Sequence, residues 1–441
     1  MRKILSLSIL TVLLAGCGVF GKYERPESIK TDNLYGAVID TTGVSMGTFS
    51  YREIFTDAFL QALIDTAVVR NTDINVARSS ITQAKNALKA DRMSFAPGVA
   101  VNPQYGYNIN QSAGWSYMLP VALDWEIDLF GKKLNRERIS KANYNMALDV
   151  YQAVQTGVVA HVSALYYQLV YLDARKTLVV AFKQSWDEQL RVVESLKSSG
   201  MSNGVAVEQT RGQYYDLEAA LIDVDKAIGD VENAICALLC QEPQHIVRTT
   251  LENMEFSDDF SVGASMLLLE NRPDVRAAER NLEACFYNVN YAKSQFYPSV
   301  NISATAAFDG NVIKTAMASL LQPIFAQGQL RANSKIAQSK LDQASAQFQQ
   351  KLIDAGIEVN NALRACYAAK DKSAGRTLQI QSMAKAEKYA RKLMLNGDAN
   401  YLEVIIAKQQ LLSAQSAALD DWLQLAQGYV TLYQALGGGT K

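Results

Sequence analysis

Alternating apolar and polar positions predict short strands in two regions of the chain. Between Trp115 and Trp125 the odd positions are all large and apolar, whereas the even positions are mixed: Ser116, Met118, Pro120, Ala122 and Asp124. Because successive side chains of a strand point to opposite faces, this period of two predicts strands with one apolar face. We expect strands at about residues 99–109, 115–126, 299–308 and 313–323. Pro103 and Pro120 cannot donate a ladder hydrogen bond, so we expect a strand end or a bulge at each.

A different period, of three to four residues, predicts two long helices, at about 132–199 and 329–396, where no proline occurs. Their apolar seams are Leu148, Tyr151, Val154, Val158, Val162, Leu165, Leu169 and Leu172 in the first helix, and Leu341, Ala344, Phe348, Leu352, Ala355, Val359, Ala362 and Cys366 in the second. Helices of ~65 residues would be ~100 Å long, about three times the hydrocarbon core of a bilayer. Since their other faces are polar, we expect them to stand in water.

The two halves of the chain repeat one another. The segment "NTDINVARSSITQAKNALKADRMSFAP" matches "NRPDVRAAERNLEACFYNVNYAKSQFYP", and both halves continue as strands, long helix, glycine break and helix. We expect repeat 1 at residues 55–255 and repeat 2 at 256–441. A unit of this length is too long for a solenoid and indicates a duplicated domain. The predicted fold class is mainly α with a small β part.

The N-terminus has the features of a lipoprotein signal peptide. A basic start is followed by the apolar run "ILSLSILTVLL" and then by Leu14, Ala15 and Gly16 before Cys17. We predict a signal peptide over 1–16, lipid attachment to Cys17 and a lipidated linker over 17–54. The alternative is an ordinary signal peptide whose first mature residue happens to be cysteine. Gly18 after the cysteine, by resemblance to bacterial lipoproteins, favours the outer membrane.

The strand that begins near Trp115 supplies a dimension. Trp115 and Trp125 are about 34 Å apart along an extended strand, or ~26 Å of height at a tilt of ~40°, which is close to the ~25 Å apolar band of an outer-membrane barrel. We therefore predict that the apolar face meets lipid and that both tryptophans belong to the membrane girdle. Four strands cannot close a barrel, and open edges in lipid are prohibitive, so the chain must form oligomers, with about eight strands in a dimer or twelve in a trimer.

Composition and chemistry exclude several classes of protein. The net charge is -1 and the mean hydropathy is -0.05, so neither a nucleic-acid-binding protein nor a bundle of membrane-spanning helices is indicated. No phosphate loop, metal-ligand cluster or catalytic triad is evident, so we expect no enzymatic activity, no metal and no cofactor apart from the covalent lipid. Cys236 and Cys240 could form a disulfide or take part in a metal site, but small buried residues are the favoured interpretation.

Several segments together resemble outer-membrane efflux lipoproteins of the TolC-like superfamily, NodT branch. After the lipobox these are "KYERP", "DWEIDLFGK", "NRPDVRAAERNL", "FYPSVNISA", "NYLEV" and "LYQALGGG", spread over nearly the whole mature chain. The resemblance implies a homotrimer in which four strands per chain contribute to a shared outer-membrane β-barrel, continued by a periplasmic α-helical barrel. It also implies a passive exit duct for small molecules or drugs, with a periplasmic adaptor and an inner-membrane transporter as partners. The alternatives are a periplasmic adaptor or a structural envelope lipoprotein, although an adaptor would have one helical hairpin and a β-rich half.

Two glycine breaks, at about 200–204 and 397–400, predict the hairpin turns at the periplasmic tips. Adaptor contact is expected at Gly200, Met201, Asn203, Gly204, Gly397 and Asp398. The resemblance implies a constriction just beyond the second turn, with Glu403 at its first acidic position and Ile406 in place of the second. We therefore predict an acidic ring at Glu403 beside an apolar ring at Ile406, with Asn400 and Tyr401 as neighbours. The alternative for Glu403 is a solvated residue on the helix surface.

Overall fold

Three pairs of equivalent helices dominate the fold. The computed structural model describes residues 20–27, 29, 49–108, 114–254, 256, 272–309, 311–322, 327–398 and 400–438. The pairs are α4 (Thr72–Met93) with α8 (Pro273–Ser294), α5 (Lys132–Ser198) with α9 (Gln329–Asn396), and α6 (Gly204–Leu238) with α10 (Tyr401–Ala435). Their lengths are 22 and 22, 67 and 68, and 35 and 35 residues, so the duplication seen in the sequence extends to the structure.

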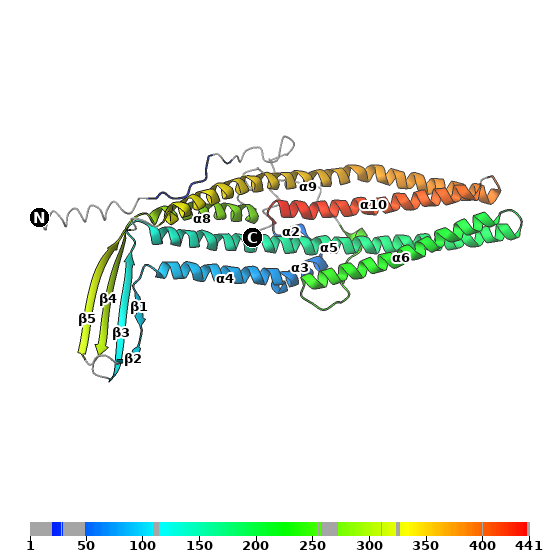
Figure 1. Cartoon of the computed structure of the whole chain (residues 1–441). Helices are drawn as coiled ribbons and strands as arrows, with labels where there is room; N and C mark the ends of the chain where they lie inside the picture. Colours follow the sequence, from blue (N-terminus) through cyan, green and yellow to red (C-terminus); the bar gives the residue numbers. More distant parts are fainter. Residues whose placement is uncertain are drawn as a thin grey trace. The chain divides into compact units, whose positions relative to one another are not determined.

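Short helices accompany the first half only, within the described ranges: α2 (Tyr51–Ile54), α3 (Ala58–Arg70) and the 3-10 helix η3 (Leu251–Asn253). Side chains of the preceding residues cap the two α-helices. Ser50 and Glu53 form a capping box at α2, and Asp57 accepts hydrogen bonds from two amides at the start of α3. Figure 1 shows the longer helices as two hairpins, α5 with α6 and α9 with α10.

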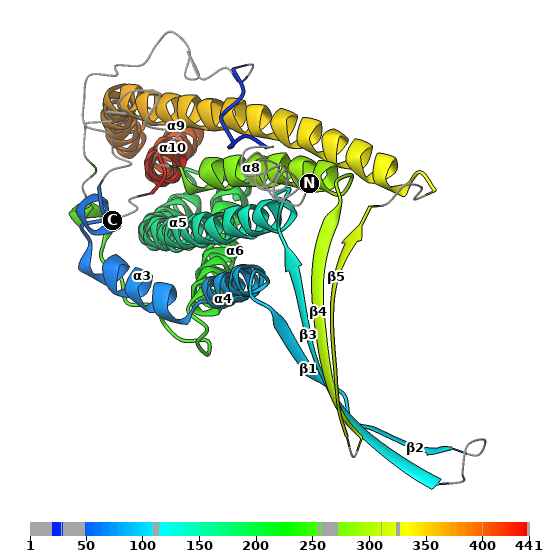
Figure 2. The same cartoon turned by 90° about the vertical axis from the view of Figure 1, so that its left-hand side faces the viewer.

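The strands form one antiparallel sheet. Its members are β1 (Gly98–Val101), β2 (Gln104–Asn108), β3 (Gly114–Ile127), β4 (Ser299–Asp309) and β5 (Asn311–Leu321). The order is β1-β3-β4-β5, and β2 also pairs with β3 (Figure 2). Because β1 and β2 keep one register along β3, they are a single interrupted strand, and the sheet is four strands wide as predicted.

The two prolines behave differently from one another. Pro103 lies at the interruption between β1 and β2, which matches the expected strand end. Pro120 lies inside β3 with unbroken pairing to β4, so the expectation of an end or a bulge there was wrong. The Pro120 carbonyl accepts a hydrogen bond from the Asn102 amide at 3.2 Å, so its missing amide hydrogen faces this same interruption rather than β4. No ladder bond to β4 is lost.

The register places apolar residues on one face of the sheet. The Cα pairs on this face include Val101 with Val121, Val121 with Ala306, Leu123 with Ala304 and Trp125 with Ile302. The other face carries polar pairs such as Asp124 with Ser303. Lys314 of β5, opposite Ala306, places one exposed cation on the apolar face near the β4–β5 turn. Its long aliphatic stem allows the ammonium group to reach water from such a position.

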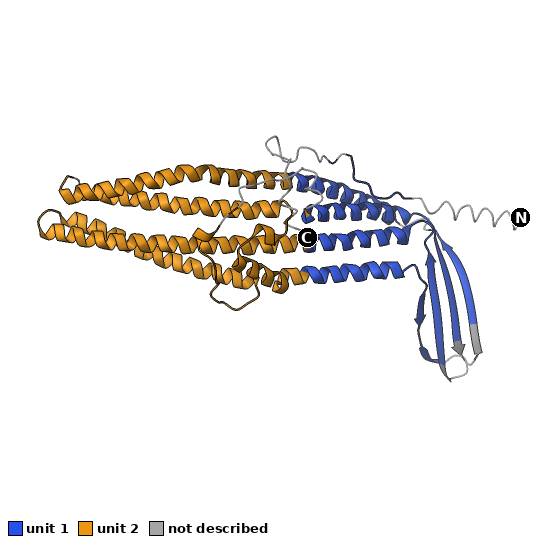
Figure 3. Cartoon of the chain, turned by 180° about the vertical axis from the view of Figure 1, so that it is seen from behind, with its two compact units in different colours: residues 1–31, 77–151, 273–353 blue, residues 32–76, 152–272, 354–441 orange. Residues whose placement is uncertain are grey.

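The chain divides into two compact units, shown in blue and orange in Figure 3. Unit 1 comprises residues 1–31, 77–151 and 273–353, and unit 2 comprises residues 32–76, 152–272 and 354–441. Each unit draws segments from both sequence repeats, because equivalent elements of the two halves fold together. The compact units are therefore not the two repeats themselves.

The predicted helix seams account for much of the helical core. In α9 the seam is buried from Ala344 to Cys366, and in α5 it is buried at Val158, Val162, Leu169 and Leu172. Leu148, at the start of the first seam, is instead exposed on the single chain. Across the described ranges, no helix has both the length and the apolar character needed to cross a bilayer.

Candidate functional site

The two hairpin turns of unit 2 are built in the same way. Gly200 and Gly397 follow the ends of α5 and α9 with φ angles of 74° and 83°, a region that glycine enters without steric cost. The same hydrogen bond closes each helix: the Met201 amide donates to the Leu196 carbonyl at 2.9 Å, and the Asp398 amide donates to the Leu393 carbonyl at 2.9 Å. Both predicted glycine breaks are therefore real helix ends.

An asparagine three residues after each glycine starts the next helix. The Asn203 side chain accepts a hydrogen bond from the Ala206 amide at 3.0 Å, and the Asn400 side chain accepts one from the Leu402 amide at 3.4 Å. Gly204 is accordingly the first residue of α6. The shared pattern Gly-x-x-Asn defines both turns. Within it, the Asn400 side chain serves as the N-terminal cap of α10.

The exposed face of the first turns of α10 combines charged and apolar side chains. Glu403 lies in the first turn, where the helix dipole favours a carboxylate. Leu402 and Ile406 are 43% and 44% exposed, whereas Val404 and Ile405 between them are buried. Leu402 was missed by sequence reasoning, although its spacing of four from Ile406 places both residues on one helix face.

Polar contacts join α10 to α6, which belongs to the other hairpin. The Tyr401 hydroxyl donates to Gln209 Oε1 at 2.9 Å, and Gln409 Nε2 donates to Gln213 Oε1 at 2.9 Å. Within one chain, Tyr401 is thus engaged with α6 and not with Glu403. We call these two hydrogen bonds the hairpin latch.

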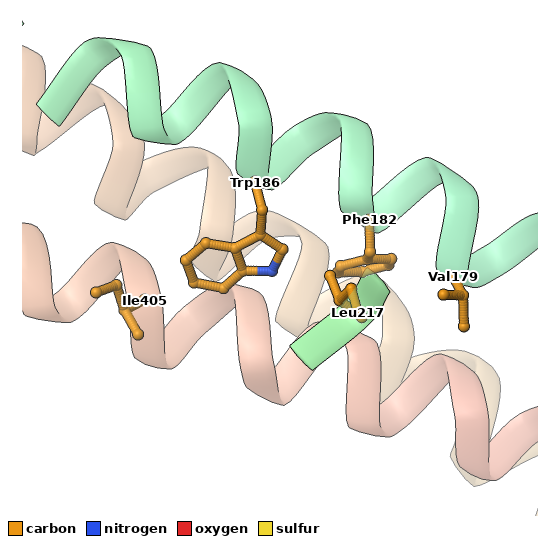
Figure 4. Close-up of a cluster of buried hydrophobic side chains, with 5 residues drawn as sticks. All are labelled: Val179, Phe182, Trp186, Leu217 and Ile405. Carbon is orange, nitrogen blue, oxygen red and sulfur yellow. The ribbon is translucent and has the colours of Figure 1, made fainter. Parts of the chain in front are cut away.

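An apolar cluster lies beside the latch. Its buried members come from three helices: Val179, Phe182 and Trp186 from α5, Leu217 from α6 and Ile405 from α10. Figure 4 shows Trp186 projecting from α5 toward the helix that carries Ile405. Tyr401 packs against this cluster, so its ring is held by apolar contacts while its hydroxyl reaches Gln209.

The predicted membrane residues lie in unit 1. Trp125 is part of β3, and its indole Nε1 donates to the Phe95 carbonyl at 2.8 Å, just after the end of α4. This bond places the ring where the strands meet the helices. Trp115 lies in β3 opposite Tyr107, but its side chain is outside the described residues, as is Cys17.

The N-terminal residues that follow Cys17 lie along unit 1. Arg25 forms two hydrogen bonds with Glu279 of α8, at 2.7 and 2.8 Å. The ring of Tyr23 meets that of Phe286 edge-on at 5.8 Å, and Phe20 meets Tyr297 at 6.4 Å. The motif "KYERP" therefore fastens this N-terminal segment to α8 within unit 1.

Cys236, Cys240, Cys285 and Cys366, which lie in the described part of the chain, are present as thiols. Cys236 is buried, in line with the favoured interpretation, and its thiol donates to the Gln244 carbonyl. Cys240 is exposed, contrary to that interpretation, because it lies beyond the end of α6 with a φ of 50° and its sulfur faces Thr72. Among the described residues, no three His, Cys, Asp or Glu side chains are grouped as metal ligands would be.

These features define a class of protein: an outer-membrane channel subunit with an amphipathic sheet and paired helical hairpins. The chain belongs to the outer membrane efflux protein family, whose model matches residues 63–241 and 265–438. It is 26% identical over 473 residues to the probable outer membrane lipoprotein SilC of Salmonella typhimurium, covering 100% of this chain and 99% of SilC. It is 25% identical over 460 residues to the cation efflux system protein CusC of Escherichia coli, covering 98% of each.

Solved channels share the fold. The outer-membrane channel OprN aligns with a TM-score of 0.87 and 22% identity, covering 96% of this chain and 99% of OprN. A structure of CusC aligns with a TM-score of 0.83 and 22% identity, covering 95% and 99%. Such channels are trimers in which a helical tunnel continues into a β-barrel, so the predicted fold class is confirmed.

The family also confirms the predicted function and location. Members are outer-membrane channels of tripartite efflux pumps, and this chain is such a component. The resemblance to TolC-like efflux lipoproteins is likewise confirmed. The family is one of channels and not of enzymes.

Proposed function

We propose that three copies of this chain form a passive duct that is closed at the beginning of α10 and opened when the hairpin latch is released. The observation that carries the proposal is the latch itself, because it joins two hairpins directly beside the exposed Leu402, Glu403 and Ile406. Apart from one covalent lipid, this duct needs no cofactor.

The sheet supports the trimer. Within the described chain β5 pairs only with β4, and the interrupted strand β1/β2 pairs only with β3, so the sheet keeps two unpaired edges. In lipid such edges must pair with another chain. Three four-stranded sheets make about twelve strands, which is wide enough for a channel.

The constriction is proposed to be mixed. Three copies of Glu403 around one axis would repel one another, so the ring favours cations instead of sealing the duct. Leu402 and Ile406, on either side of Glu403 on the same face, would add apolar rings that exclude water when they are narrow. Leu402 thus extends the constriction predicted from the sequence.

Conductance measurements test this arrangement. In planar bilayers, Glu403→Gln should lower cation selectivity, and Ile406→Asp should raise both cation selectivity and block by divalent ions. The matched control is Glu242→Gln, which removes one exposed carboxylate from the loop after α6. If Glu403→Gln behaves like Glu242→Gln, Glu403 is a solvated surface residue and the constriction lies elsewhere.

Both glycine turns are proposed as adaptor contacts. Met201 is 73% exposed beside Gly200, so an apolar side chain is available at the first turn. Asp398 follows Gly397 at the second turn and offers a carboxylate. Met201→Lys should weaken binding of the periplasmic adaptor, measured by pull-down, whereas Lys385→Met on the exposed side of α9 should leave it unchanged.

Cys17 is proposed to carry the lipid anchor. Phe20 packs on Tyr297, which lies two residues before the start of β4, and three residues span at most about 10 Å. The lipid would therefore enter the membrane close to the strands. Cys17→Ser should abolish incorporation of labelled palmitate while trimers still insert, because one lipidated cysteine adds little beside a spanning barrel. Incorporation into the variant would refute the assignment.

The cargo is proposed to be selected by the inner-membrane transporter. CusC is named for cation efflux and TtgI of Pseudomonas putida for toluene efflux, and this chain is 25% identical to each. The same fold thus serves chemically different cargoes. Exchange of the transporter should change the exported compounds, whereas exchange of this channel for a relative that accepts the same adaptor should not.

A further inference from the structure

A groove of about 630 Å³ lies in unit 2 between α5, α9 and α10, and its lining does not include Leu402, Glu403 or Ile406. Its walls are mainly apolar and include Leu178, Phe182, Ile380 and Leu411. A volume in this range, with mostly apolar walls and a few polar groups, is typical of sites for small molecules. The few polar groups of such a site determine which ligand it binds and in which orientation.

The first polar group is a buried cation. Lys408 is only 3% exposed, and its Nζ donates to the carbonyl and hydroxyl oxygens of Ser185, both at 2.9 Å. The ammonium also lies 5.4 Å from the ring centre of Trp186. None of these partners is an anion, and no carboxylate of the described chain lies within ion-pair distance of it. A buried charge without a counter-ion is costly, so an anion at this point would be favoured.

The second polar group is an acceptor without a donor. Gln415 Oε1 is buried and accepts no hydrogen bond from the described chain. Gln415 follows Lys408 by seven residues, or two helical turns, so both side chains lie on one face of α10 about 10 Å apart. Leu411 lies between them and also lines the groove.

Two further charged residues line the groove. Arg391 and Glu387 of α9 face the same groove. Together with Lys408 they make two cations and one carboxylate, which matches a ligand with a single negative charge. A second acidic group on the ligand would be repelled by the carboxylate of Glu387.

We propose that this groove binds a small amphipathic anion, whose acidic head lies at Lys408 and Arg391, whose apolar body lies along Phe182 and Leu411, and whose donor group bonds to Gln415. The ligand would contact α5 of one hairpin and α10 of the other. Its binding would therefore strengthen the contact between the hairpins without involving the constriction residues.

Calorimetric titration of the trimer in lipid nanodiscs tests the proposal, with empty nanodiscs as the blank. The probes are 5-aminonaphthalene-1-sulfonate, neutral 1-naphthylamine and cationic 1-naphthylmethylammonium. The wild-type protein should bind the sulfonate at least tenfold more tightly than either other probe. Equal affinity for the sulfonate and the ammonium probe would overturn the proposal.

Variants locate the site. Lys408→Met keeps the length of the side chain and should weaken sulfonate binding at least tenfold, with little effect on 1-naphthylamine. The matched control Lys388→Met, an exposed residue of α9 outside the groove, should bind as the wild type does. In the wild type, sulfonate bound beside Trp186 should quench tryptophan emission. Trp186→Phe should still bind the sulfonate but should not show this quenching. Unchanged sulfonate affinity in Lys408→Met would exclude this site.

The pH dependence of sulfonate binding provides an independent test of the same site. Burial lowers the pKa of Lys408 to about 8, with Glu387 and Glu188 opposing the shift and Arg391 adding to it. Lys408 therefore loses most of its charge between pH 7 and pH 9.5. Sulfonate binding should therefore weaken over this interval in the wild type and not in Lys408→Met. A parallel loss in both proteins would contradict the proposal.

Discussion

Removal of the Tyr401 hydroxyl should open the duct, and the expected size follows from its geometry. Tyr401→Phe deletes one hydrogen bond of 2.9 Å to Gln209 and leaves the ring in its apolar contacts. A hydrogen bond contributes about 0.5–1.5 kcal/mol net, and this exposed bond belongs at the low end because water competes for it. Three copies sum to ~1.5 kcal/mol, which corresponds to about a tenfold increase in the ratio of open to closed channels.

Single-channel recording in planar bilayers measures this ratio directly. The matched control is Tyr389→Phe, since Tyr389 is a 61% exposed tyrosine of α9. A double-mutant cycle with Gln209→Leu should show that the second substitution adds little once the first has been made. If Tyr401→Phe leaves the open probability unchanged, or if the two substitutions add fully, the hydrogen bond does not hold the closed state.

Two further predictions concern the sheet and the turns. Val121→Lys places a charge on the lipid-facing side and should destabilise the barrel by roughly 2–4 kcal/mol per chain. Ser303→Lys, on the polar face, should be tolerated. Equal melting temperatures of the two variant trimers would show that the assignment of the faces is wrong. Gly397→Ala should cost ~1–2 kcal/mol, because its φ of 83° is left-handed, while Gly375→Ala inside α9 should stabilise by ~0.5–1 kcal/mol. Urea unfolding of both glycine variants checks this order, and no steric contact obscures it, since a Cβ at either site meets open space.

Local patterns in the sequence were enough to predict the strands and the long helices of this protein. The alternation from Trp115 to Trp125 predicted β3, and the register later placed its apolar positions on one face of the sheet. Gly200 and Gly397 predicted the ends of α5 and α9. These features depend on side-chain period and on backbone freedom, which act between residues close in the chain, and the duplication repeated each of them.

Contacts between distant segments were decided only by the tertiary structure. Pro120 stays inside a strand because the strand beside it is interrupted at that point. Tyr401 and Gln209 are 192 residues apart, so nothing local to either predicts their hydrogen bond. Lys408 has the sequence context of a solvated helix residue, yet it is buried because α5 packs over it. Periodicity indicates which face of an element is apolar, but the packing of elements distant in sequence determines which polar groups lose water and which partners they meet.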